Sequence, residues 1–234
     1  MKKKIIFRYR LASDTGCAPC VDNDLFTLAC CKGGKYRSGK PIECGLRYFI
    51  GVLWAENNMM FNDYEIYTLG IYKNKFLFFA KITDVIEMIE YYKHSEANKK
   101  YRNRKDDIYY INKGKLKRNN FNCDFHGYDE KQHKRDQAGK YVLLSNEFVY
   151  YGMEAKLCPE EILSYVPKTR GERPNGRNKY KPSDILSDKN IKESEKLFEL
   201  IKEFCGGEMH IREGAKGRQP HTKLEVKTYH KGCS

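Results

Sequence analysis

Tyr64-Glu-Ile-Tyr-Thr-Leu-Gly-Ile-Tyr72 is a run of aromatic and β-branched residues, and Lys75-Phe-Leu-Phe-Phe-Ala-Lys-Ile-Thr83 follows it after a short turn at Lys73 and Asn74. Aromatic and β-branched side chains favour extended strands, and polar residues between two such runs favour a turn. The two runs therefore predict a sheet.

Further strands are predicted on both sides of this pair. Lys2 to Arg10 is a basic strand, and Leu46 to Trp54 is again rich in aromatic and β-branched residues. A bent strand or a hairpin is predicted at Lys140 to Ser145 and Phe148 to Tyr151, which are bounded by glycines. The first two-thirds of the chain is therefore dominated by β signals.

Two segments predict helices instead. Asp84 to His94 places Ile86 and Ile89 at helical spacing and is expected to pack on the sheet. A later helix can be capped by Ser187 and Asp188. Its apolar stripe consists of Leu197, Phe198, Ile201, Phe204 and Cys205, and it ends at Gly206 and Gly207. We expect an α+β fold, a mostly antiparallel sheet or small barrel with flanking helices.

Two polar segments interrupt this pattern. Asn112 to Gln137 has almost no aliphatic residues and predicts a long exposed excursion or functional loop. Val166 to Ser183, rich in Arg, Lys, Pro and Gly, predicts a mobile cationic loop. A length of 234 residues favours one domain, which we expect over residues 1–165. Residues 166–234 should then form the basic loop, the amphipathic helix and a C-terminal extension packed on it.

The chain carries a formal net charge of +13 at pH 7. Such a charge attracts phosphates, nucleic acid or an acidic surface, and it equally suits a merely soluble lysine-rich protein. The N-terminus lacks the pattern of a signal peptide, and no apolar run is long enough to cross a bilayer. We therefore expect a cytoplasmic protein without membrane association, whose nine cysteines are not a disulfide framework.

The loop after the first strand reads Asp14-Thr-Gly-Cys-Ala-Pro19, an irregular stretch of the kind that commonly carries function. Further short motifs follow it in order. They are Thr27-Leu-Ala-Cys-Cys-Lys32, Leu46 to Val52, Lys81-Ile-Thr83, Asp107-Ile-Tyr109, Val142-Leu-Leu-Ser145 and Phe148-Val-Tyr-Tyr-Gly152. This series, over residues 5–170, resembles the nucleotide modification associated domain family, second type.

The resemblance implies a context of DNA base hypermodification, without a defined reaction. The chain departs from the family at Cys20-Val21 and in a longer segment after Lys32. By fold-level analogy the β-rich layout is also similar to PUA-like barrels of the EVE, ASCH and YTH groups, which hold a base at the mouth of a small barrel. We therefore expect the protein to recognise a nucleotide or nucleic-acid base. No cofactor is indicated.

A second hypothesis is an enzyme that modifies such a base. Asp14, His133 and Asp136 could transfer protons, since an imidazole beside carboxylates can act as a base near neutral pH; the alternative is that they are solvated residues of a charged loop. The matching motifs supply the expected ligand-binding residues, which are Thr15, Lys32, Asp107, Tyr109, Ser145 and Tyr151. Lys32 precedes Gly33-Gly34, but the pattern of a P-loop is absent, which disfavours nucleoside triphosphate hydrolysis.

Tyrosines interleaved with arginines indicate contact with nucleic acid. Tyr109 and Tyr110 offer stacking surfaces near Arg102 and Arg104, which can pair with phosphates. Tyrosines of β proteins also serve in packing, and that alternative stays open. Further phosphate contacts are expected along the basic stretch Asn98 to Arg118 and in the cationic loop, from Arg170, Arg173 and Arg177.

Cysteine spacing suggests a third hypothesis, a zinc-stabilised interaction protein. The soft ligands available are Cys17, Cys20, Cys30, Cys31, Cys123 and His126. Adjacent Cys30 and Cys31 would face opposite ways on a strand, however, so we favour buried thiols and assign no metal. A nucleophilic role of Cys17 or Cys30 lacks an identifiable His or Lys partner.

Overall fold

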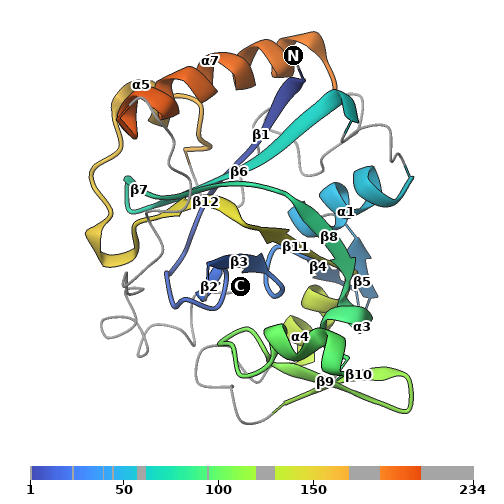
Figure 1. The fold of residues 1–234 in the computed structure, drawn as a ribbon. Coiled ribbons are helices and arrows are strands. Elements are labelled where there is room, and N and C mark those ends of the chain that lie inside the picture. The colour runs from blue at the N-terminus through green and yellow to red at the C-terminus, as the bar shows by residue number, and fades with distance from the viewer. Residues whose placement is uncertain are drawn as a thin grey trace.

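The computed structural model of the protein describes residues 2–22, 24–38, 40–43, 45–56, 62–93, 95–119, 130–168 and 185–206. Within these ranges the strands form two four-stranded sheets and two two-stranded hairpins, with helices around them (Figure 1). Strand pairs are antiparallel with one exception, and neither described sheet closes into a barrel. The predicted α+β class with mostly antiparallel sheets is confirmed.

The first sheet has the order β1 (Lys3–Arg10), β6 (Tyr64–Tyr72), β7 (Lys75–Lys81) and β12 (Glu147–Tyr150). The two runs that predict a sheet are its central strands. Lys73 and Asn74 connect them with positive φ values of 47° and 59°, the geometry that a two-residue hairpin requires. The exception to antiparallel pairing is β1, which runs parallel to β6.

The second sheet has the order β2 (Cys20–Asp22), β3 (Leu25–Leu28), β11 (Tyr141–Ser145) and β8 (Asp84–Glu87). The chain passes directly between the sheets, because β11 belongs to the second and β12 to the first. Ser145 holds this bend. Its hydroxyl accepts a hydrogen bond from the Glu147 N–H at 3.0 Å and donates to the Glu147 carbonyl at 2.9 Å. Of the two predicted alternatives, a bent strand and a hairpin, the structure has the bent strand.

Two short hairpins complete the strands. They are β4 (Gly34–Arg37) with β5 (Lys40–Glu43), and β9 (Tyr109–Asn112) with β10 (Lys115–Arg118). The second hairpin and α4 (Glu130–Gln137) fall largely in the segment predicted to be a long exposed excursion or functional loop. Asn112, Lys115 and Lys117 are exposed as expected, but these residues form strands and a helix and not an irregular loop. The few apolar side chains of the hairpin left its strand pattern too weak to recognise.

The strand predicted at Leu46 to Trp54 is wrong, since these residues belong to helix α1 (Leu46–Glu56). Leu46, Ile50 and Leu53 are buried at helical spacing, and this period outweighs the aromatic composition. The helix predicted from Asp84 begins later, as α3 (Met88–Tyr91), because the preceding four residues pair with β11 as β8. Further short helices follow in the described part of the chain. They are η1 (Glu96–Tyr101), η3 (Gly152–Glu154) and α5 (Glu160–Leu163).

The late helix is confirmed as α7 (Asp188–Phe204), and the Ser187 hydroxyl caps it by accepting a hydrogen bond from the Asn190 N–H at 3.3 Å. Leu197 and Ile201 bury the apolar stripe of α7 against the outer face of the first sheet. The β1 edge is also held, because the Ile6 N–H donates to the Ser194 hydroxyl at 3.2 Å. No described helix is long and apolar enough to cross a membrane.

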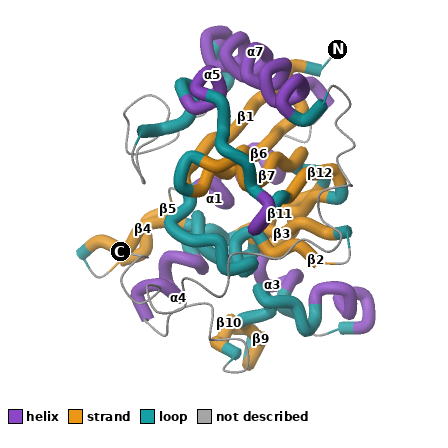
Figure 2. The backbone as a smooth tube through the Cα atoms, turned by 90° about the vertical axis from the view of Figure 1, so that its left-hand side faces the viewer, coloured by secondary structure: helices purple, strands orange, loops and turns teal. Residues whose placement is uncertain are grey.

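The described elements stack in layers, with α7 over the first sheet, the second sheet beneath it, and a lower layer of α3, η1, α4 and the β9–β10 hairpin (Figures 1 and 2). Each interface has its own apolar cluster. The cluster between the sheets contains Phe26, Phe78 and Phe148, and the one beneath the second sheet contains Tyr91, Tyr92 and Tyr109. Buried polar residues concentrate around these two lower interfaces.

Candidate functional site

An aromatic row crosses the inner face of the first sheet. Strand register aligns Tyr9, Gly70, Phe78 and Tyr150, and side chains at paired positions point to the same side. Gly70 has no Cβ, which leaves room for the Phe78 ring. Tyr9 and Tyr150 therefore lie on either side of Phe78, and the loops that follow β1 and β3 approach these two tyrosines.

Each tyrosine of the row carries one charged partner. The Tyr150 hydroxyl lies 3.1 Å from both oxygens of Asp14, to which it donates, and burial together with the Asp14 charge raises the pKa of Tyr150. At the other end the Lys32 ammonium lies 4.8 Å from the centre of the Tyr9 ring. Two predicted residues, Asp14 and Lys32, thus contact the tyrosines at the two ends of one aromatic row.

The thiols of Cys17 and Cys30 bring the same two loops into contact beneath the second sheet. The sulfur atoms of Cys17 and Cys30 are 3.1 Å apart, and both residues are buried. The hydrogen bond with Cys30 lowers the pKa of Cys17, but burial and the nearby Cys31 and Asp106 outweigh it and raise this pKa to about 11. Burial raises the pKa of Cys20 to about 12. These thiols are therefore protonated at neutral pH and are poor nucleophiles.

Among the described residues no group of three or more His, Cys, Asp or Glu side chains is arranged to hold a metal ion. Cys123 and His126, the downstream zinc ligands considered above, lie outside the described ranges. The zinc hypothesis therefore needs a direct measurement.

We expect the purified protein to contain well below one zinc per chain, because the described cysteines form a buried pair rather than a tetrahedral set. Elemental analysis of protein prepared without chelator measures this. A content of about one zinc per chain, lost together with folding on chelation, would instead support the zinc-stabilised interaction protein.

Asp106 is the centre of a buried polar network in the lower layer. Its carboxylate accepts hydrogen bonds from the hydroxyls of Tyr91, at 3.0 Å, and Thr27, and it pairs with Arg104 at 3.5 Å. Arg104 is only 2% exposed, and its guanidinium also donates to the carbonyls of Cys20, Asp22 and Leu25. Arg104, predicted to contact phosphate, thus binds the backbone around the β2–β3 turn.

Asp136 organises a second buried network. One of its oxygens accepts a hydrogen bond from the Cys31 N–H at 2.8 Å, and the other accepts from the Tyr109 hydroxyl at 2.9 Å. Arg47 is fully buried and donates to the carbonyls of Cys31 at 2.7 Å and Asp136 at 2.6 Å. These contacts hold Cys31 and Lys32 in the left-handed backbone conformation, with φ of 57° and 51°. Asp136 thereby positions the loop that carries Lys32.

His133 lies one helical turn before Asp136, with its ring centre 5.1 Å from that of Tyr109. The Gln137 amide nitrogen lies 3.4 Å from the Leu116 carbonyl, which can only accept, and 2.9 Å from His133 Nε2. If Gln137 donates to both, the neutral imidazole carries its proton on Nδ1. Burial lowers the pKa of His133, which favours this neutral form at pH 7.

A cavity of about 600 Å³ opens beside His133. Among the described residues, no acceptor lies within hydrogen-bond reach of His133 Nδ1. The cavity has an apolar part and a charged part contributed by β10, α4 and the residues around α3. Its lining comprises Glu87, Met88, Ile89, Lys115, Leu116, Lys117, Glu130, His133, Lys134, Gln137, Lys140 and Tyr141.

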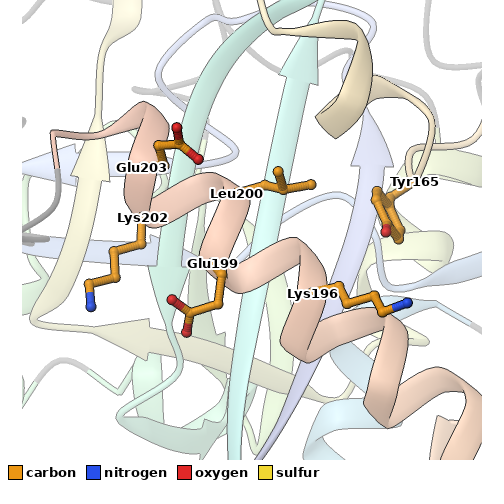
Figure 3. Close-up of a pocket in the computed structure, with 6 residues that line it drawn as sticks. All are labelled: Tyr165, Lys196, Glu199, Leu200, Lys202 and Glu203. Atoms are coloured by element: carbon orange, nitrogen blue, oxygen red, sulfur yellow. The ribbon is translucent and has the colours of Figure 1, made fainter.

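A second hollow of about 700 Å³ lies on α7 and is lined by Tyr165, Lys196, Glu199, Leu200, Lys202 and Glu203 (Figure 3). Its two lysines are balanced by two glutamates, and Figure 3 shows Lys196 and Lys202 pointing away from each other. Such a surface offers no convergent charge for an anion. The cavity beside His133 is the better candidate among the described residues.

The sequence-predicted residues fall into separate places. Tyr109, His133 and Asp136 lie together in the lower layer, whereas Asp14 lies with Tyr150 at the aromatic row. The remaining predicted residues are dispersed. Thr15 accepts a hydrogen bond from the Cys17 N–H, Asp107 accepts one from the Asn103 N–H, Ser145 holds the strand bend, Tyr151 contacts Cys205, and Arg102 follows η1. Arg170, Arg173 and Arg177 lie outside the described residues.

Sequence reasoning singled out none of Arg47, Asp106 and Tyr150, and it placed Lys115 and Lys117 only within a basic stretch expected to contact phosphates. Arg47 lies in the segment wrongly predicted as a strand, so its inward direction was not expected. Asp106 adjoins the motif residue Asp107 and carries no signal of its own. The cavity lysines, by contrast, were visible as part of the basic composition, and only the fold shows which of them converge.

Comparison with family models gives a match to Nucleotide modification associated domain 2 over residues 3–190. The searches of curated proteins and of solved structures gave no match. The matched range includes both sheets, the aromatic row, the two buried networks and the cavity beside His133.

Proposed function

Because the chain belongs to the nucleotide modification associated domain 2 family, we propose that it recognises a nucleotide or a nucleic-acid base in a DNA base-modification context. We place this recognition in the cavity beside His133. The observation that carries the proposal is the combination, in one cavity, of a cationic rim, an apolar surface and an imidazole ring.

The lining of the cavity suits the two chemical parts of a nucleotide. Lys115, Lys117, Lys134 and Lys140 supply ammonium groups for a phosphate, against two glutamates in the same lining. One of these glutamates, Glu130, is already paired with Lys134 at 2.8 Å. The lining also contains four apolar or aromatic residues, against which a planar base can lie. These are Met88, Ile89, Leu116 and Tyr141.

His133 adds a specific polar contact. In the tautomer set by Gln137 its Nδ1–H is a donor without an acceptor among the described residues. Carbonyl oxygens and ring nitrogens of nucleobases are acceptors for such a donor. Nδ1 is buried in this structure, so the ring has to turn toward the cavity before a base can accept its hydrogen bond. The gain from satisfying this donor favours a ligand containing a base over a simple anion.

Titration calorimetry with nucleoside monophosphates at low salt tests this proposal. We expect His133→Ala, which removes one neutral hydrogen bond to the base, and Lys134→Ala, which removes one charged contact to the phosphate, each to weaken binding by roughly tenfold. Lys131→Ala is the matched control, because Lys131 is exposed on the same helix but does not line the cavity. An absence of binding to the wild-type protein, or an equal loss in the control, contradicts the proposed site.

The enzyme hypothesis, with Asp14, His133 and Asp136 as a proton-transfer set, stays a prediction. The three side chains do not form one cluster in the structure. Asp136 accepts two hydrogen bonds from the protein, and Asp14 contacts Tyr150. Mass spectrometry of a nucleotide or oligonucleotide incubated with the protein distinguishes catalysis from recognition alone. A covalent change of the substrate that depends on His133 would favour the enzyme.

A further inference from the structure

The β9–β10 hairpin has two chemically different faces. Its register pairs Tyr110 with Lys117 and Asn112 with Lys115, so these four side chains share one face. All four are exposed, and Tyr110 retains 38% of its accessible surface. The other face carries Tyr109, which is buried at 1% exposure against the lower layer. The hairpin is thus anchored on one side and leaves an aromatic ring in solvent on the other.

The exposed face is also strongly cationic. Lys113 lies in the hairpin turn beside Lys115, and residues 108–119 contain no Asp or Glu. Tyr110 and Lys117 are direct cross-strand neighbours, with Cβ atoms about 5 Å apart in such a pair. A ring available for stacking therefore stands next to an ammonium group available for a phosphate. This combination is typical of surfaces that bind single-stranded nucleic acid.

The hairpin face and the cavity beside His133 share two residues. Lys115 and Lys117 belong to the exposed face and also line the cavity, whereas Leu116, which lines the cavity as well, pairs with Ile111 on the opposite face of the hairpin. A strand held at these two lysines can place one base on Tyr110 and another base in the cavity. A free mononucleotide would occupy only the cavity and would make no use of Tyr110.

We infer that the ligand of this site is a single-stranded nucleic acid, held by stacking on Tyr110 and by phosphate contacts from Lys113, Lys115 and Lys117. The inference rests on the proposed function, because it takes the cavity to bind a base. A duplex is disfavoured, since its bases are stacked on one another and cannot reach the Tyr110 ring. An acidic protein segment would satisfy the lysines but would gain little from the ring.

Fluorescence anisotropy with a labelled oligo(dT) strand tests the inference, alongside calorimetry with thymidine monophosphate. The wild-type chain should bind the strand at least tenfold more tightly than the mononucleotide. Tyr110→Ala should weaken strand binding by roughly tenfold, the loss of one base–aromatic stack, while mononucleotide affinity stays within about twofold. Tyr110→Phe retains the stacking ring and should bind the strand as the wild type does.

The lysines are tested through the salt dependence of strand binding. Lys113→Ala, Lys115→Ala and Lys117→Ala combined should flatten the plot of log affinity against log salt by about 2, for three phosphate contacts on a single strand. Lys189→Ala, Lys192→Ala and Lys196→Ala combined remove equal charge from α7, at the opposite end of the molecule (Figure 1). This control should leave the slope nearly unchanged.

The possible outcomes separate the two proposals. Mononucleotide binding with no tighter binding of the strand overturns the single-strand inference and leaves the cavity proposal standing. Tyr110-dependent strand binding without mononucleotide binding overturns the cavity proposal alone. The single-strand inference also fails if Tyr110→Ala has no effect, if a duplex binds as tightly, or if polyglutamate competes as well as unlabelled oligo(dT).

Discussion

Asp106→Ala is expected to lower the free energy of unfolding by about 3–5 kcal/mol, the cost of removing one member of a buried ion pair. Arg104 would remain buried without its counter-charge, and the hydroxyls of Tyr91 and Thr27 would lose their acceptor. Urea denaturation followed by circular dichroism measures the change. The effect should be large because Asp106 itself is fully buried.

Asp63→Ala provides the control for this experiment. Asp63 is exposed, so its replacement removes the same charge without opening a buried network and should change stability by less than about 0.5 kcal/mol. A loss below about 1 kcal/mol for Asp106→Ala would mean that the network around Arg104 does not stabilise the β2–β3 turn.

Asp136→Ala is expected to destabilise the protein by about 3–5 kcal/mol, since two hydrogen bonds to a charged group are lost at once. The Cys31 N–H and the Tyr109 hydroxyl would both be left without this acceptor. Asp136→Asn keeps one acceptor oxygen of similar shape and should retain about half of that stability. Denaturation of the three proteins in parallel measures this order.

The same Asn variant separates a structural role of Asp136 from a catalytic one. If Asp136 only positions the loop of Cys31 and Lys32, folded Asp136→Asn should still bind nucleotides. If it takes part in proton transfer, the folded variant should keep its affinity and lose any substrate conversion that the wild-type protein shows. Equal stability of Asp136→Ala and the wild type would refute the positioning role.

The elements that could be predicted are those whose pattern is local. The strands around Lys73 and Asn74 and the capped helix after Ser187 carry their own signals, and both are present. Helix α1 was mistaken for a strand because Tyr48, Phe49 and Trp54 raise the strand propensity of a segment whose buried residues have helical spacing. The amino-acid composition of this segment favours a strand, whereas the spacing of its buried residues is helical, and the segment forms a helix.

The site was predictable only where residues lie close in sequence or in a motif. His133 and Asp136, which the sequence grouped with Asp14, lie one helical turn apart on α4, whereas Asp14 lies at the aromatic row. The partnership of Asp106 with Thr27 spans 79 positions and depends on how β2 and β3 pack over the lower layer. The outward direction of Tyr110 and the inward direction of Tyr109 likewise depend on strand register, which the sequence of a short hairpin does not determine.

The contact between β1 and α7 has a consequence for biosynthesis. Ile6 and Ser194 are 188 positions apart, so a ribosome adding about 5–20 residues per second makes α7 roughly 10–40 s after β1. Throughout that interval the outer N–H groups of β1 have no helix beside them, and an open strand edge is a template for pairing with other chains. The edge of β1 is therefore a part of the nascent protein at which a chaperone would prevent pairing with other chains until α7 is made.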